Sequence, residues 1–227
     1  MRQTMKRHLS LLFRAGLFII TLLAWSRVRD RGPSGAFDVL MIVGAVLLVF
    51  PVAWLGRWML DRRPTASRAA LVTTFVHFVL MILFGVAIIR AVVTHEGWRG
   101  WVLPIPQPVG FIMAIVTGAA TLLTVAVLAV KGLGAPFAIA LSARLAADGL
   151  YAWTRNPMVL ATLACLLSVG IWFRSALFVL WVLVLVTPAW LAFVKIYEER
   201  ELEIRFGAPY LEYRRRTPML VPRRPRA

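Results

Sequence analysis

Six long apolar segments, separated by short stretches rich in arginine, constrain what this chain can fold into. A helix needs about 20 mostly apolar residues to cross the hydrocarbon core of a bilayer. Lipid offers no hydrogen-bond partner to the backbone, so a crossing segment satisfies its own N–H and C=O groups most economically as a helix. We therefore predict an all-α fold, a polytopic transmembrane bundle of about six spans. The segments are Leu9–Trp25, Ala36–Leu60, Ala69–Val93, Val109–Val130, Pro157–Phe173 and Ser175–Val194.

The composition supports a membrane protein and excludes several other classes. Of the 227 residues, 60% are apolar and 16% are charged, whereas soluble domains have about 45–50% and about 25%. Disordered chains are poor in apolar and aromatic residues, and a disulfide scaffold needs more than the lone Cys165. The polar residues are too few to cover a water-soluble globule of this size.

The formal net charge of +16 has two interpretations, a nucleic-acid surface or the flanks of membrane spans. The alternating loops carry nineteen Lys and Arg on one side of the predicted membrane and six on the other, with Arg14 inside a span. Cytoplasmic loops are enriched in Lys and Arg, so we expect a multi-pass protein with both termini in the cytoplasm and no nucleic-acid partner. The basic C-terminal tail is expected to bind anionic lipids, at about 1 kcal/mol per residue; it contains Arg214, Arg215, Arg216, Arg223, Arg224 and Arg226.

A change in composition near Lys131 suggests two parts. Residues 1–108 are expected to form N-terminal transmembrane helices. The first of these is expected to remain as a membrane anchor and not to be a cleaved signal peptide. Residues 109–227 are expected to form a catalytic membrane core with a cofactor-binding loop, a C-terminal helical hairpin that turns at Arg174, and an amphipathic cytosolic tail.

Two polar clusters in the second part are expected to meet. Asn156 and Pro157 are predicted to be the N-cap and the first residue of a helix. The free N–H groups at the start of that helix, with Arg155 beside them, suit a carboxylate or phosphate. Glu198 directly follows an apolar run, at a depth where charge is costly and often functional. The hairpin brings the end of the sixth span beside the start of the fifth, so both clusters are predicted to share one site.

Other reactive residues have structural interpretations. His77 lies mid-span and is expected to form an interhelical hydrogen bond. His8 and His95 fall on opposite sides of the membrane, so we expect no metal site. Cys165 is expected to pack, and no serine has a His–Asp pair near it in the predicted topology.

The ordered motifs resemble those of the isoprenylcysteine carboxyl methyltransferase and phospholipid methyltransferase group of membrane enzymes. The resemblance extends from about Lys131 to Arg224. Its motifs are Gly149-Leu150-Tyr151-x-x-x-Arg155-Asn156-Pro157-Met158, a hydrophobic hairpin, Glu198-Glu199-x-x-Leu202, Phe206-Gly207-x-x-Tyr210-x-x-Tyr213, and a closing Pro218…Pro222-Arg223.

The resemblance implies a helical bundle that binds S-adenosylmethionine on its cytosolic side and opens by a tunnel to a lipophilic acceptor. No catalytic side chain is assigned, because the sulfonium already activates the methyl group. The residues implied to line the cofactor pocket, with Arg155 added on electrostatic grounds, are Arg144, Leu145, Ala146, Tyr151, Arg155, Asn156, Pro157, Met158, Val159, Glu198 and Glu199.

The methyl acceptor stays open between a prenylcysteine-like carboxylate, a lipid amine and another small hydrophobic molecule. Two positions depart from the family pattern. Val159 replaces a usual tyrosine, and Val194 stands where the eukaryotic prenylcysteine enzymes have an arginine for the substrate carboxylate, with Lys195 as a substitute. Two other functions are alternatives: an NADPH-dependent sterol-type membrane reductase, which shares a similar hairpin, and a non-enzymatic membrane scaffold.

Overall fold

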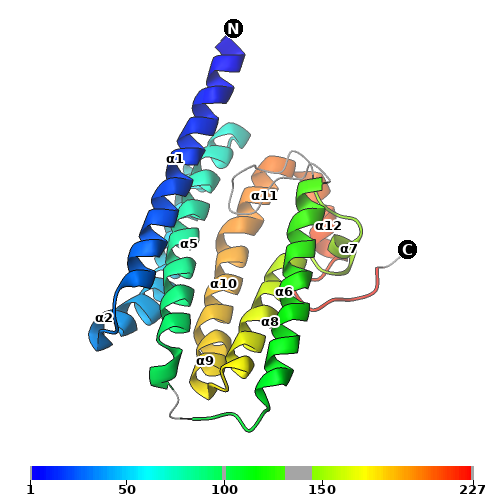
Figure 1. Ribbon diagram of the computed structural model, residues 1–227. Coiled ribbons are helices and arrows are strands. Elements are labelled where there is room, and N and C mark those ends of the chain that lie inside the picture. Colours follow the sequence, from blue (N-terminus) through cyan, green and yellow to red (C-terminus); the bar gives the residue numbers. More distant parts are fainter. Residues whose placement is uncertain (1, 99–100, 131–144, 226–227) are drawn as a thin grey trace.

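The computed structural model describes residues 2–98, 101–130 and 145–225, which form a bundle of helices that run alternately up and down (Figure 1). The first half contains α1 (Arg2–Asp30), then α2 (Gly35–Val39), η1 (Leu40–Gly44), α3 (Ala45–Leu47) and α4 (Val49–Arg62) in one continuous rod, then α5 (Ala66–Val93) and η2 (His95–Trp98). The second half contains α6 (Gln107–Val130), α7 (Leu150–Trp153), α8 (Pro157–Trp172), a rod made of α9 (Ala176–Trp181), η4 (Val182–Val186), α10 (Thr187–Phe193), η5 (Val194–Glu198) and α11 (Glu199–Phe206), and finally α12 (Ala208–Arg216).

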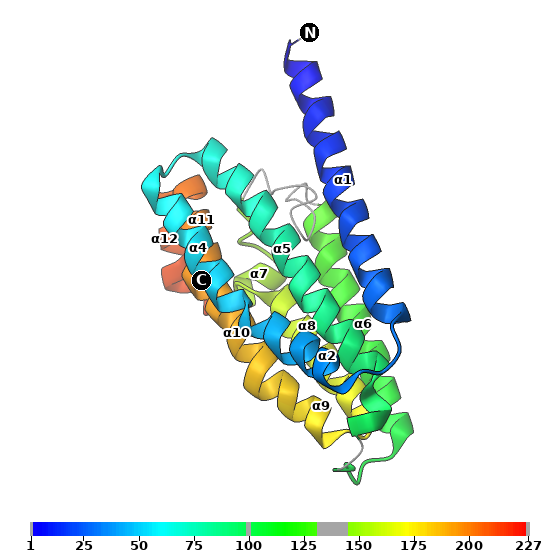
Figure 2. The same cartoon turned by 90° about the vertical axis from the view of Figure 1, so that its left-hand side faces the viewer.

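The prediction of an all-helical membrane bundle is confirmed. Within the part of the chain that the structure describes, four helices are long and apolar enough to cross a membrane, and α8 is a shorter apolar helix. Helix α1, which contains Arg14, is 29 residues long and lies along α5 (Figures 1 and 2). The four long apolar helices are Gly35–Arg62, Ala66–Val93, Gln107–Leu128 and Ala176–Phe206.

The last long helix differs from its predicted bounds. Its expected end at Val194 was wrong, because the helix continues to Phe206. Gly207, at φ 60°, ends it, and Pro209 lies in the first turn of α12. The helix continues through η5, a π-helical turn that carries Glu198. Such turns insert an extra residue and are frequent at functional sites.

The predicted hairpin turn at Arg174 is present. Arg174 has a positive φ of 55°, and its backbone carbonyl accepts a hydrogen bond from the Leu103 N–H at 2.9 Å. Ser175 caps α9, because its Oγ accepts a bond from the Phe178 N–H at 3.2 Å. The hairpin of α8 and the α9–α11 rod is therefore fixed to the loop that follows α5.

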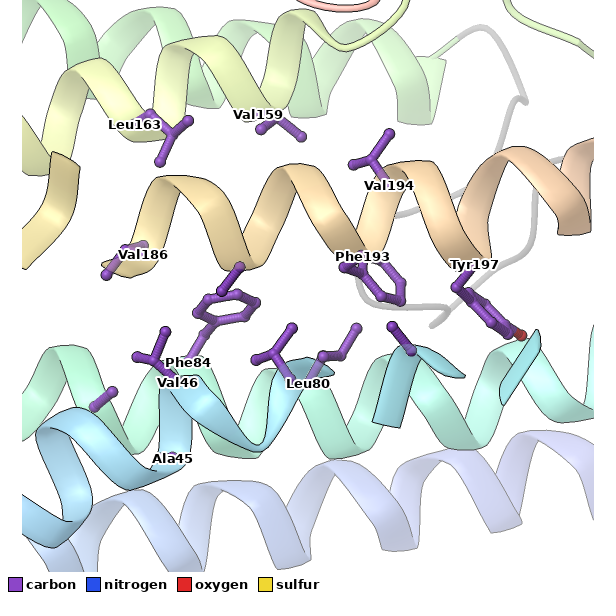
Figure 3. Close-up of a cluster of buried hydrophobic side chains, with 14 of the residues drawn as sticks. Ala45, Val46, Leu80, Phe84, Val159, Leu163, Val186, Phe193, Val194 and Tyr197 are labelled. Carbon is purple, nitrogen blue, oxygen red and sulfur yellow. The ribbon is translucent and has the colours of Figure 1, made fainter. Parts of the chain in front are cut away.

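The apolar core lies between helices from both halves of the chain. Figure 3 shows Val46 from the first rod and Leu80 and Phe84 from α5 on the side of the α9–α11 rod, and Ala45 belongs to the same cluster. On the other side of that rod, Val159 and Leu163 of α8 complete the cluster. One core thus holds the hairpin against the first helices.

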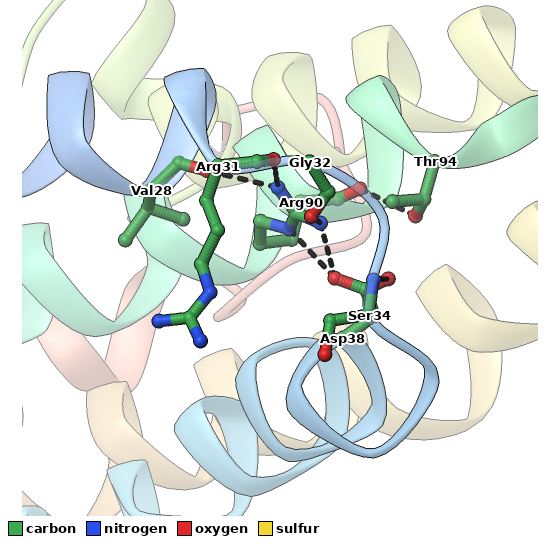
Figure 4. A network of polar contacts seen from close by, with 7 residues as sticks. All are labelled: Val28, Arg31, Gly32, Ser34, Asp38, Arg90 and Thr94. Atoms are coloured by element: carbon green, nitrogen blue, oxygen red, sulfur yellow. Dashed lines mark hydrogen bonds and ion pairs between the residues drawn. The ribbon is translucent and has the colours of Figure 1, made fainter.

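A buried ion pair joins the first helices at the end of the bundle opposite the N-terminus. The Arg90 guanidinium is fully buried and its Nε donates to Asp38 Oδ1 at 2.9 Å. Its remaining N–H groups donate to the backbone carbonyls of Val28, Arg31 and Gly32 (Figure 4). The charge is neutralised and its donors are used, which is the condition under which a buried arginine is tolerated. The network ties α1 and α2 to α5.

Candidate active site

A cavity of about 470 Å³ lies between α5, α8, the α9–α11 rod and α12, within the range of small-molecule sites. Its lining has polar groups toward one end and apolar groups toward the other. The polar groups are Tyr151, Arg155, Asn156, Glu198, Glu199, Tyr210 and Tyr213. The apolar groups include Leu80, Met81, Phe84, Ile88, Ile89, Trp190 and Phe193.

The two acidic neighbours at the polar end have different surroundings. Glu199 forms an ion pair with Arg155 at 2.8 Å, in which both side chains are at least nine-tenths buried. Its other oxygen accepts a hydrogen bond from Lys195 Nζ at 3.1 Å. Glu198 also lines the cavity, and the described residues give its carboxylate neither a hydrogen bond nor an ion pair. The charge of Glu199 is therefore balanced within the protein, whereas the carboxyl group of Glu198 is left for the cavity.

Arg155 retains one hydrogen-bond donor for a ligand. Its side chain lines the cavity, and Nη1 contacts Glu199 and donates to the Tyr210 hydroxyl at 3.3 Å. Its Nε is buried and has no hydrogen-bond partner among the residues that the structure describes. An unpaired buried donor is costly, so this atom is suited to an anionic group of a ligand.

Asn156 is the N-cap residue of α8 and Pro157 lies in its first turn, as predicted, but Asn156 makes no capping bond. Its side-chain Nδ2 instead donates to the Met219 carbonyl at 2.9 Å. Thr154 Oγ1 donates to the same carbonyl at 3.1 Å, and the Arg155 N–H donates to the Pro218 carbonyl at 2.9 Å. The segment after α12 therefore packs along the start of α8, and these bonds fix the edge of the cavity.

The cavity tyrosines are neutral hydrogen-bonding groups. Burial, and next the charge of Glu199, raise the pKa of Tyr210 to about 12. Burial, and next the charge of Glu198, raise the pKa of Tyr151 well above its usual value. The Tyr213 hydroxyl donates to the Tyr151 carbonyl at 2.7 Å. These phenols stay protonated at neutral pH, so Glu198 is the acidic group without a partner among the described residues at this end.

Most of the predicted cofactor residues lie together. Pro157 is buried in the first turn of α8 and does not line the cavity. Arg144 lies outside the described residues, and Lys195 lies outside the cavity lining. The predicted residues that line the cavity are Leu145, Ala146, Tyr151, Arg155, Asn156, Met158, Val159, Glu198 and Glu199.

The first half of the chain contributes cavity residues that no sequence motif indicates. Trp25 of α1 and seven residues of α5, from His77 to Ile89, line the cavity. Gly85 lets α1 approach, because a Cβ there would lie 2.2 Å from Trp25 Nε1. In the sequence these residues look like ordinary parts of apolar spans, so periodicity gives no sign of a cavity. Among the described residues, no group of three His, Cys, Asp or Glu is placed to hold a metal ion.

Comparison with protein families finds a match for the segment that carries most of this site. Residues 106–208 match the family model described as phospholipid methyltransferase. The matched segment contains α6, the hairpin and both glutamates of the cavity, and the family implies methyl transfer to a lipophilic acceptor. No curated protein and no solved structure matches the chain. The four long apolar helices agree with the membrane setting of that family.

Proposed function

We propose that this protein transfers the methyl group of S-adenosylmethionine to a lipophilic acceptor at the cytoplasmic face of the membrane. The observation that carries the proposal is one cavity with an unpaired carboxylate, Glu198, and an unpaired buried donor, Arg155 Nε. The amino-acid end of S-adenosylmethionine carries an ammonium and a carboxylate. These complement the two protein groups, so the residues present fit the cofactor.

The remaining polar groups extend this fit. Glu198 suits the ammonium or the ribose hydroxyls of the cofactor. The first turn of α8 has its earliest intrahelical bond at the Leu160 N–H, which bonds to the Asn156 carbonyl. The N–H groups of Met158 and Val159 therefore lack intrahelical partners, and such groups attract anions. S-adenosylmethionine, when bound, supplies a methyl group that is already electrophilic. The protein then has to align an acceptor with that methyl group, and alignment alone accelerates bimolecular reactions greatly.

The apolar end of the cavity suits the acceptor. Leu80, Phe84 and Ile88 follow one another along α5, toward the end of the bundle opposite the polar groups. A lipophilic chain there would be removed from water at about 25 cal/mol per Å² of apolar surface. We place the polar end in the cytoplasm, together with both termini, because nineteen of the 26 Lys and Arg lie at that side in the predicted topology.

Isothermal titration of the purified protein with S-adenosylmethionine, in detergent and in nanodiscs, tests the proposal. We expect saturable binding, and competition by S-adenosylhomocysteine, which shares the amino-acid and adenosine parts. Parallel titration with NADPH tests the reductase alternative. Saturable NADPH binding without S-adenosylmethionine binding would overturn the proposal in favour of that alternative, and binding of neither would favour a scaffold.

A further inference from the structure

His77 lies where the polar and apolar parts of the cavity meet. It is the first cavity residue of α5 counted from the predicted cytoplasmic end, and the later ones are apolar up to Ile89. The helical rise places Ile89 about 18 Å further along the axis. On the facing rod, Phe193 contacts the His77 ring edge-on, with ring centroids 5.6 Å apart, and Glu198 lies just over one turn nearer the predicted cytoplasmic end. A cofactor at the polar end and an acceptor chain at the apolar end would bring their reacting atoms together at this level.

The hydrogen bonding of His77 leaves one ring nitrogen available as a base. Nδ1 lies 2.9 Å from the Thr73 carbonyl of its own helix. A carbonyl accepts and never donates, so Nδ1 carries the proton and the neutral ring has its lone pair on Nε2. The described residues give Nε2 no hydrogen-bond partner. The ring itself lines the cavity.

The groups around the ring hold it in place. Tyr197 presents its ring edge-on at 6.5 Å between centroids, and its hydroxyl is 2.8 Å from Thr73 Oγ1. Of the other charged groups on the α9–α11 rod, Arg205 is near enough for its charge to act on the ring, and Glu198 lines the same cavity. The Arg205 guanidinium is paired with Glu201 at 2.6 Å. No acidic side chain among the described residues pairs with the imidazole, so its free nitrogen is left for a ligand.

We propose that His77 is the general base of the methyl transfer, and that the acceptor is a lipophilic thiol, alcohol or amine. This inference rests on the proposed function. The acceptor heteroatom forms a bond to the methyl carbon as the carbon–sulfur bond breaks, and that electron pair stays on sulfur. The proton of the heteroatom passes to His77 Nε2, which becomes an imidazolium and later releases it to water. A carboxylate acceptor has no proton to remove, so a base at this position distinguishes the two substrate classes.

The first test reads the imidazole directly and needs no turnover. Diethyl pyrocarbonate acylates unprotonated imidazole nitrogens, and mass spectrometry can locate the product among His8, His77 and His95. We expect diethyl pyrocarbonate to modify His77 at Nε2. We expect 1-dodecanethiol to protect His77 from this modification, both alone and together with S-adenosylhomocysteine. An unmodified His77 beside a modified His95 would overturn the proposal, because Nε2 would then be closed to the cavity.

The second test measures methyl transfer from radiolabelled S-adenosylmethionine to four probes that share a dodecyl chain. The probes are 1-dodecanethiol, 1-dodecanol, dodecylamine and dodecanoate. We expect the wild type to methylate at least one of the first three, and His77→Asn, which keeps a donor toward Thr73, to lower kcat about 100- to 10,000-fold. Imidazole added to His77→Ala should restore part of the rate. His95→Asn, in η2 at the opposite end of α5, is the matched control and should keep the wild-type rate.

The outcomes separate this inference from the proposed function. Titration with S-adenosylmethionine should give the same Kd for the wild type and His77→Asn. A wild type that binds no S-adenosylmethionine refutes the proposed function itself. If the wild type binds S-adenosylmethionine but methylates only dodecanoate, or none of the probes, His77 is not the general base. The proposed cofactor binding would still stand in that case. An unchanged kcat in His77→Asn would also refute the role of His77 as general base.

Discussion

At the scale of single residues, neighbouring side chains of the same chemistry take different roles. Glu198 and Glu199 are adjacent and both line the cavity. Glu199 contacts Arg155 and Lys195, whereas Glu198 is left without a partner in the part of the chain that the structure describes. Successive residues of a helix point about 100° apart, and the π-helical turn η5 changes the register between α10 and α11. The ligand-binding role therefore belongs to Glu198 in our proposal, and Glu199 organises Arg155.

Glu198→Gln is expected to weaken S-adenosylmethionine binding about 10- to 100-fold, because a hydrogen bond to a charged group contributes about 1.5–3 kcal/mol. Isothermal titration measures the change. The matched control is Glu203→Gln on the same helix; Glu203 lies outside this cavity and pairs at 3.5 Å with Arg200. Equal affinities in all three proteins would contradict the role of Glu198.

The buried pair of Arg90 and Asp38 gives a second prediction at this scale. Asp38→Asn leaves the fully buried Arg90 guanidinium without a counter-charge, and breaking such a pair costs about 3–5 kcal/mol. We expect Tm to fall clearly. Thermal unfolding in detergent measures this change. Asp30→Asn is the control, since its pair with Arg29 is more than 60% exposed on both sides and should change Tm little. An unchanged Tm in Asp38→Asn would show that Arg90 is satisfied by backbone carbonyls alone.

At the scale of helices, close approach decides how the hairpin sits in the bundle. Gly110 near the start of α6 faces the end of α8, and a Cβ there would lie 2.3 Å from the backbone nitrogen of Trp172. That contact is with backbone, which cannot rotate away. Small residues at such crossings let transmembrane helices pack closely. Through α8, this contact sets the position of the loop that carries Arg155 and Asn156.

Gly110→Ala is therefore expected to force α6 and α8 apart and to cost about 1–3 kcal/mol. The measurement is the midpoint of thermal unfolding in detergent, with S-adenosylmethionine affinity as a second readout. Gly16→Ala in α1 is the control, because a Cβ there meets nothing within 4 Å. A variant at Gly110 as stable as the one at Gly16 would mean that the crossing tolerates a wider spacing.

At the scale of the whole molecule, the alternating helices place the loops at two ends (Figure 2). The N-terminus, the turn between α4 and α5, and the turn between α11 and α12 lie at one end (Figure 1). The turns between α1 and α2 and between α8 and α9 lie at the other. The cavity's polar groups belong to the first end, so the orientation in the membrane determines which compartment supplies the cofactor.

Cysteine labelling in intact cells tests this orientation. In a Cys165→Ser background, Thr65→Cys in the turn before α5 should react with an impermeant maleimide only after the membrane is permeabilised. Ser34→Cys in the turn before α2 should react in intact cells. Both positions are exposed, so burial does not explain a difference between them. The reverse pattern would place the polar end of the cavity outside the cytoplasm.

The fold and the polar half of the site were largely predictable from the sequence. Apolar length predicted helices because lipid leaves few other options for the backbone, and Pro157 and Arg174 marked ends of segments. The motifs around Asn156 and Glu198 indicated the family that residues 106–208 match. These signals are local, since each depends on residues close together in the chain.

The tertiary structure decided which side chains share the cavity and what each one contacts. Trp25 and His77 line it, although each lies in a span that carries no motif. Asn156 bonds to Met219, 63 residues away, instead of capping its helix. Such pairings depend on how helices cross and on which face each one turns inward. Those quantities are set by the packing of the whole bundle, and a pattern within one segment does not contain them.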